Sequence, residues 1–544
     1  MSIPTDVVNI SLLLLFIFTC HRFRLRSSQS RQNVEAAKLK NVDLDAISSK
    51  AARRLRAKLV EVLPESVVMP DDAEKFQDCL KGYWAQQACE MMPACVIRPR
   101  NVKEVSRAIW VLKGEYDRRR WERRMRPRNA PETATEGLFA IRSGGHSPAA
   151  GASSVQGGAL IDLSLFDEVT PAEDGKSVVI GAGCRWVDVY KALEAKGLAV
   201  AGGRNSAVGV GGLTLGGGLS FFSPRYGMVC SNIIEYEVAL ADGCVVKASE
   251  TSFPDLWRVL KGGGNNFGIV TRFTARAFPS SNIWSGFLYL PSSQAPKVLS
   301  CFREFLDRTV MNDEGKTYDE FAAGPIACFT YLQQLGVEAI AVALTHTKVP
   351  EDRKQWPTCW RTSGFSKLWR FWSTCSVKSL CAATDEMSVL NPSGRRQEFA
   401  TTTILNDRAT LEAAHDAYRD AIGEIRKCRI KNMSWTLVLQ PMLPAWVRKG
   451  DTNVLGLESC SNDALVNVSF TVNWALSQDD ATVQRITRAT IEQIDAYAEA
   501  HDRRHRYRYM NYCGGWQRPF DGYGQGNVEL MREGACVGGF KVGE

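Results

Sequence analysis

The run RSGGHS, residues 142–147, is the strongest structural signal in the sequence. Successive small residues let backbone N–H groups converge on an anion, and His146 follows them directly. A lone histidine is more often structural, but at the end of such a loop its side chain is placed beside whatever the loop binds. His146 is therefore the first candidate for a residue that touches a ligand.

Two further glycine clusters follow along the chain. One is VGVGGLTLGGG, residues 208–218, and the other is GGGNNFGIV, residues 262–270. Glycines expose backbone amides where side chains would block a pyrophosphate. A single cluster could be a tight turn, but three of them exceed what turns require. The pattern predicts a large, phosphate-bearing ligand.

Several common active-site motifs are absent. No loop spells GxGxxG before a predicted helix or GxxxxGK[ST], which argues against a Rossmann NAD site and an NTPase. GxSxG and HExxH are missing as well, so acyl transfer and zinc hydrolysis lose their usual evidence. The 16 cysteines never show CxxC spacing, and we expect no metal site.

Length and charge set further limits. A chain of 544 residues is too long for a single core, which predicts two domains or more. Much of the net charge of +8 comes from two basic stretches, residues 22–56 and 118–128. No nucleic-acid-binding motif accompanies them, so we expect no nucleic-acid partner.

The N-terminus carries an apolar run, VVNISLLLLFIFTC, residues 7–20. Its length suits the core of a signal peptide and is short for a bilayer span. We expect entry into the secretory pathway. A short uncleaved anchor, which would bring membrane contact, and a misplaced start site are the alternatives.

The pattern of elements changes along the chain. Residues 21–60 are basic and helix-prone without a clean apolar stripe, and they resemble a leader or surface segment. Residues 137–276 alternate short β-rich runs with glycine clusters. After residue 278 longer strands predict one antiparallel sheet with helices on one face, including residues 410–425 and a helix from residue 481. Residues 115–132 and 355–385 look inserted.

The ordered motifs resemble a known family over residues 75–530. They are PACVIRPRNVKEVSRAI, FAIRSGGHSPAAG, VVIGAGCRWVDVYKAL, AVGVGGLTLGGG, RYGMVCSNI, DLWRVLKGGGNNFGIVT, FATTTI and YMNY. They resemble the berberine-bridge-enzyme-like flavoproteins of the vanillyl-alcohol-oxidase group. The resemblance implies an α+β fold with a leader (1–74), a PCMH-type FAD-binding domain (75–279), a substrate-binding domain (280–504) and a C-terminal segment returning to the FAD domain (505–544).

The resemblance also implies a covalent cofactor. His146 should bond to the 8α-methyl carbon of FAD, since neutral imidazole is a competent nucleophile near pH 7. Asn205 stands where many relatives have a second, cysteinyl link, so one link is expected. The other implied cofactor-binding residues are Arg142, Ser143, Gly144, Gly145, Ser147, Val208, Gly209, Gly211, Gly212, Gly217, Gly218, Tyr226, Gly227, Gly268, Ile269, Val270 and Asn511.

The segment YMNY implies the catalytic side chains. Tyr512 is the first candidate for a base and Tyr509 the second, because a phenolate can act if a neighbouring donor or cation stabilises it. The alternative is that both tyrosines only pack against the flavin. Four further residues lie on strands that would roof the pocket, namely Trp435, Gln440, Thr402 and Thr403.

The function implied is that of a flavin oxidase. It would take a hydride from an alcohol, amine or phenolic small molecule to flavin N5, in secondary metabolism, with O₂ reoxidising the flavin to give H₂O₂. A small aliphatic residue at Val208 favours oxygen access. The alternative is the same scaffold used as a non-redox cyclase or as a flavin-binding protein without turnover.

Overall fold

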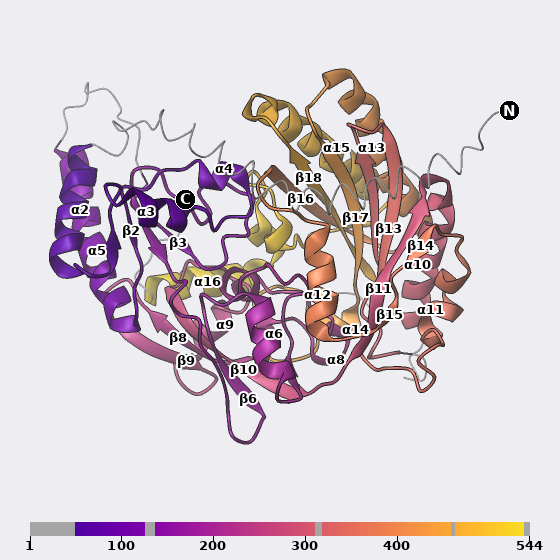
Figure 1. The fold of residues 1–544 in the computed structure, drawn as a ribbon, viewed down its shortest axis with the longest axis horizontal. Coiled ribbons are helices and arrows are strands. Elements are labelled where there is room, and N and C mark those ends of the chain that lie inside the picture. Colours follow the sequence, from indigo (N-terminus) through magenta and orange to yellow (C-terminus); the bar gives the residue numbers. More distant parts are fainter. Residues whose placement is uncertain (1–48, 126–136, 311–317, 459–462, 538–544) are drawn as a thin grey trace.

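The computed structural model describes residues 49–125, 137–310, 318–458 and 463–537. These residues form three sheets of four, six and nine strands. In Figure 1 the two smaller sheets lie on one side of the molecule and the nine-stranded sheet on the other. The predicted α+β class, with an antiparallel sheet backed by helices, is confirmed.

The four-stranded sheet has the order β1-β2-β4-β3, in which β2, β4 and β3 are parallel. Its strands and helices are β1 (Val67–Val68), β2 (Cys95–Ile97), β3 (Phe139–Arg142), β4 (Ala159–Asp162), α2 (Lys50–Val62), α3 (Ala73–Leu80), α4 (Gln86–Cys89) and α5 (Val102–Arg124). Helix α2 packs on α5 and buries Ala52, Leu55 and Leu59. The expectation that residues 21–60 have no apolar stripe was wrong for residues 50–60, because these three residues share one helix face; residues 21–48 lie outside the described residues.

The six-stranded sheet is antiparallel, and its connections carry two of the three glycine clusters, residues 208–218 and 262–270. Its path is β5-β6-β10-β8-β9, and β7 pairs with β10. The elements are β5 (Val169–Pro171), β6 (Ser177–Gly181), β7 (Leu198–Val200), β8 (Ile233–Ala239), β9 (Val245–Ser249), β10 (Ile269–Pro279), α6 (Trp186–Glu194), α7 (Val210–Leu215), α8 (Ser223–Tyr226) and α9 (Pro254–Val259).

The nine-stranded sheet runs β14-β11-β13-β12-β17-β18-β16-β19, with β15 beside β11. Its strands are β11 (Ile283–Pro291), β12 (Ile326–Leu332), β13 (Val337–His346), β14 (Trp372–Ser373), β15 (Ser376–Lys378), β16 (Arg396–Leu405), β17 (Ser434–Met442), β18 (Leu465–Trp474) and β19 (Arg504–His505). Its helices are α10 (Ala295–Val310), α11 (Thr358–Thr362), α12 (Leu380–Val389), α13 (Arg408–Cys428), α14 (Pro444–Val447) and α15 (Asp480–Ala500). Helices α10, α13 and α15 cover the outer face in Figure 1.

The end of the described chain crosses back to the smaller sheets. After β19, Tyr507, Tyr509 and Tyr523 join the same apolar core as β8 and β10. Helix α16 (Gln525–Val537) then packs on α9. This return path places the YMNY segment between the glycine loops and the nine-stranded sheet.

The apolar run at residues 7–20, and the secretory-signal prediction with it, lies outside the described residues. Within the four described stretches, no helix has both the length and the apolar character needed to cross a membrane.

Candidate active site

A cavity of about 640 Å³ lies between the glycine loops and the inner face of the nine-stranded sheet. It brings together residues from three distant parts of the sequence. The predicted site residues that line it are Ser143, Gly144, Gly145, His146, Ser147, Val208, Gly209, Gly211, Gly212, Gly268, Ile269, Val270, Tyr509, Asn511 and Tyr512.

The first glycine loop is anchored from behind by Arg142. Its buried guanidinium donates to the Asp162 carboxylate at 2.8 Å and to the backbone carbonyl of Cys79, so Arg142 does not line the cavity. The backbone N–H groups of residues 144–147 have no acceptor in the described part of the chain. Successive N–H groups without an acceptor, next to a glycine of positive φ, are typical of an anion-binding nest.

Two of the glycines are required because the loops touch each other. A Cβ added to Gly144 would lie 2.4 Å from the Cα of Gly209, and one added to Gly209 would lie 2.4 Å from the Gly144 nitrogen. Gly145 has φ +61°, in the left-handed region that favours glycine. The loop backbones therefore form the cavity wall themselves.

Four other predicted cofactor residues lie outside the cavity wall. Gly217, Gly218 and Gly227 adopt positive φ, and a Cβ on Gly227 would lie 2.2 Å from the Lys449 carbonyl oxygen. Tyr226 stacks on Phe278 with ring centroids 4.1 Å apart. These four residues shape turns and packing behind the wall.

His146 lines the cavity with an imidazole that is held neutral. Its ring stacks on Trp84, with centroids 4.5 Å apart and planes 8° from parallel. Burial, and secondly the nearby Arg185, lower the pKa of His146 to about 4. Its Nε2 atom is buried and has no hydrogen-bond partner among the described residues. An unprotonated imidazole in this state is available as a nucleophile.

The two tyrosines of YMNY differ in their surroundings. The Tyr509 hydroxyl oxygen accepts hydrogen bonds from the Leu219 N–H at 3.1 Å and from Asn511 Nδ2 at 3.0 Å. Burial raises the pKa of Tyr509, which disfavours its ionisation at neutral pH. The Tyr512 hydroxyl instead receives a hydrogen bond from Arg204 Nη2 at 3.2 Å. Of the two hydroxyls, only that of Tyr512 contacts a cationic side chain among the described residues.

The sheet wall divides into an apolar and a polar half. Strands β11, β12 and β13 present Phe287, Tyr289, Ile326, Cys328 and Ala341, and α12 adds Met387. Strands β17 and β18 present mostly polar side chains, which are Ser434, Thr436, Gln440, Ser469, Thr471 and Asn473, together with Val438; Thr330 is the polar lining residue of β12. A ligand on this wall meets hydrocarbon on one side and hydrogen-bonding groups on the other.

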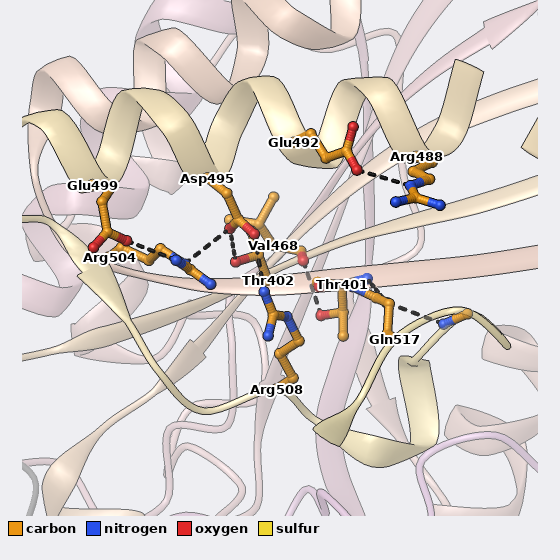
Figure 2. A network of polar contacts seen from close by, with 11 residues as sticks. Thr401, Thr402, Val468, Arg488, Glu492, Asp495, Glu499, Arg504, Arg508 and Gln517 are labelled. Atoms are coloured by element: carbon orange, nitrogen blue, oxygen red, sulfur yellow. Dashed lines mark hydrogen bonds and ion pairs between the residues drawn. The ribbon is translucent and has the colours of Figure 1, made fainter. Parts of the chain in front are cut away.

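Of the four residues predicted to roof the pocket, only Gln440 lines it. Trp435 faces the helices and packs on Phe470, with centroids 4.7 Å apart. Thr402 donates its hydroxyl to Asp495 of α15, which also binds Arg508 (Figure 2). Thr403 is fully buried and does not reach the cavity. The prediction was wrong for these three; for Trp435 and Thr402 the reason is that successive strand residues face opposite sides.

The sequence interpretation missed Arg204, Trp84 and most of the polar half. A signal for the polar half exists, because SWTLVLQ and VNVSFTVN alternate polar and apolar residues along β17 and β18. Arg204 adjoins Asn205, a position already singled out. No pattern in the sequence marks Trp84.

The cavity fits FAD on three counts. The nest at residues 144–147 suits a diphosphate, and no aspartate or glutamate occurs among the described lining residues to repel it. A buried, partnerless nitrogen of His146 lies in the same wall. The glycine loops leave backbone where side chains would fill the space.

Comparisons with known proteins agree. A family model described as "FAD binding domain" matches residues 133–249. The FAD-dependent monooxygenase tpcD of Cochliobolus heterostrophus is 33% identical over 460 residues, which cover 83% of this chain and 82% of that protein. The chain belongs to the FAD-dependent oxidoreductases that carry this FAD-binding domain.

Solved structures share the fold of this oxidoreductase. Berberine bridge enzyme from Eschscholzia californica superposes with a TM-score of 0.65 at 14% identity, covering 89% of this chain and 96% of that one. A glucooligosaccharide oxidase from Acremonium strictum, described with 6-S-cysteinyl, 8α-N1-histidyl FAD, gives 0.65 at 17% identity with the same coverage. The PCMH-type fold predicted for the oxidoreductase is confirmed.

Proposed function

We propose that this oxidoreductase is an oxidase that holds FAD covalently through His146 alone and oxidises an alcohol, amine or phenolic small molecule of secondary metabolism. The observation that carries the proposal is the neutral imidazole of His146, whose Nε2 has no hydrogen-bond partner among the described residues, beside the glycine nest and in the same cavity as Tyr512. When bound, FAD supplies an acceptor that takes a hydride at N5 and passes the two electrons to O₂ as H₂O₂.

The role of His146 is that of a tether. Its low pKa keeps the ring unprotonated at pH 7, and the stacked Trp84 restrains the ring plane. The histidyl and cysteinyl links named for the glucooligosaccharide oxidase support such a tether. Asn205 stands where the family resemblance implies a cysteine in many relatives, which supports a single link in this chain.

The role of Tyr512 is to take a proton from the substrate. As a C–H bond gives up its hydride, the substrate O–H or N–H gives up its proton to Tyr512, which leaves a C=O or C=N bond. Arg204 donates a hydrogen bond to the Tyr512 oxygen and holds that side chain at the cavity. The proton then passes to solvent, and the balance is substrate plus O₂ giving oxidised product plus H₂O₂. Val208 lines the cavity with a small aliphatic side chain, which leaves space for O₂.

Acid precipitation of the purified protein tests the tether. We expect yellow flavin to remain with the pellet of the native chain and of His501→Ala, an exposed control, and to be lost from His146→Ala. Acid-stable flavin on His146→Ala would assign the tether to another side chain.

Anaerobic flavin bleaching followed by oxygen addition tests the reaction. With a substrate that bleaches the flavin, we expect one H₂O₂ for each product formed. Incorporation of ¹⁸O from labelled O₂ without peroxide would make the protein a monooxygenase, the activity named for tpcD. Conversion of a substrate without any bleaching would indicate a non-redox cyclase.

A further inference from the structure

The cavity carries one unneutralised charge. Arg204 is the only lysine, arginine, aspartate or glutamate among the described residues that line it, and His146 is neutral. Arg204 is partly buried, and none of the ion pairs of the described residues includes it. A cation withdrawn from water without a counter-ion is costly, and a ligand of opposite charge removes that cost.

The hydrogen bonds of Arg204 leave much of the guanidinium unused. Both of its bonds come from Nη2, one to Gln440 Oε1 at 2.6 Å and one to the Tyr512 hydroxyl at 3.2 Å. Both acceptors are neutral. The Nε and Nη1 groups have no acceptor among the described residues. These N–H groups can form the paired hydrogen bonds that a carboxylate or similar oxyanion accepts.

Arg204 lies close to the boundary between the polar and the apolar half of the sheet wall. Its partner Gln440 lies on β17, and β17 is hydrogen-bonded to β12, the last strand of the apolar half. Phe287 and Ile326 both pair with Ala343 of β13. Ala327, the residue after Ile326, pairs with Leu439, the residue before Gln440. A ligand whose charged end meets Arg204 can therefore extend over hydrocarbon.

We propose that the substrate is an organic anion, in which a carboxylate, enolate or phenolate oxygen pairs with Arg204 and an apolar skeleton lies along β11, β12 and β13. The inference rests on the proposed function, because it takes this cavity as the active site. It narrows the three substrate classes given above, since a protonated amine would be repelled by Arg204 and would meet no carboxylate in the described wall.

Calorimetric titration with three ligands of one shape tests the proposal. The ligands are 2-naphthoate, 2-naphthamide and 2-naphthylmethylammonium, which are anionic, neutral and cationic. On the native chain we expect 2-naphthoate to bind at least about tenfold more tightly than the amide, the size of a charge-assisted hydrogen bond, and the ammonium to bind most weakly. A parallel titration with an acidic phenol, below and above its own ionisation, distinguishes a phenolate or enolate from a carboxylate.

Three variants complete the test. Arg204→Gln should remove the preference for 2-naphthoate, while its affinity for 2-naphthamide stays within about twofold of the native value. Arg204→Lys should keep part of the preference. Arg408→Gln makes the same charge change on an exposed helix residue and should keep all of the preference. Two results would overturn the proposal: 2-naphthylmethylammonium binding to the native chain as tightly as 2-naphthoate does, or Arg204→Gln keeping the native preference for 2-naphthoate over 2-naphthamide. Calorimetry reports binding with or without flavin, so failure to load FAD would count against the proposed oxidase and not against this anion site.

Discussion

The two walls of the cavity bind by different means. The glycine-loop wall offers backbone N–H groups at residues 144–147 and permits no side chain where Gly144 meets Gly209. The sheet wall offers side chains, mostly apolar on β11 to β13 and mostly polar on β17 and β18. A backbone wall holds a constant ligand such as FAD, whereas a side-chain wall can be changed one residue at a time. Changes in substrate therefore require no change in the cofactor loops.

The largest effect that tests this contrast should come from a methyl group added to the backbone wall. Gly144→Ala places a Cβ against Gly209, and we expect loss of flavin loading together with a lower melting temperature, since overpacking costs about 1–3 kcal/mol. Gly212→Ala is the control for packing. Gly212 also lines the cavity, but a Cβ added there meets no protein atom within 4 Å. This variant should weaken flavin binding at unchanged apoprotein stability. Normal loading by Gly144→Ala would show that the loops tolerate a side chain.

The next effect concerns Tyr512, the proposed base. Tyr512→Phe removes the proposed base, and we expect the anaerobic rate of flavin reduction to fall by about 10²–10⁴-fold with flavin still attached. Tyr509→Phe leaves two donors without their acceptor and should cost about 1–3 kcal/mol of stability. Its reduction rate should change far less. The reverse ranking of the two rates would make Tyr509 the base.

A smaller effect separates the two faces of the sheet. Thr402→Val removes a hydrogen bond to the Asp495 carboxylate and should lower the free energy of unfolding by about 1.5–3 kcal/mol without changing KM. Thr436→Val changes a side chain that lines the cavity, so its KM should change. Equal KM changes in both variants would contradict the assignment of faces.

The smallest effect is an absence of pH dependence. Only the neutral form of His146 can attack, and that form predominates above its pKa of about 4. Covalent attachment of FAD to apoprotein should therefore proceed at a constant rate from pH 8 to about pH 5 and halve near pH 4. Trp84→Ala exposes the ring, which should shift the decline toward the ordinary histidine pKa of about 6.5. A decline of the native rate below pH 6.5 would show that the imidazole is not held neutral.

Much of the backbone wall could be predicted from the sequence. RSGGHS and VGVGG stand out because glycine is the residue that permits close backbone contact, and fifteen of the predicted residues line the cavity. The helices predicted over residues 410–425 and from residue 481 lie within α13 and α15, whose apolar faces repeat with helical spacing. Even so, Gly217, Gly218, Tyr226 and Gly227 lie behind the wall, since glycine also serves ordinary turns.

The sequence by itself determined the α+β class, the glycine loops and His146, because backbone conformation and helix periodicity depend on neighbouring residues. Only the tertiary structure decided that Arg204 meets Tyr512 and Gln440, that Trp84 stacks on His146, and that Thr402 faces α15. Arg204 and Tyr512 are 308 residues apart, and their contact arises from strand order and from the return of the C-terminal segment. Those long-range arrangements form when the two cores pack together, and no local pattern encodes them.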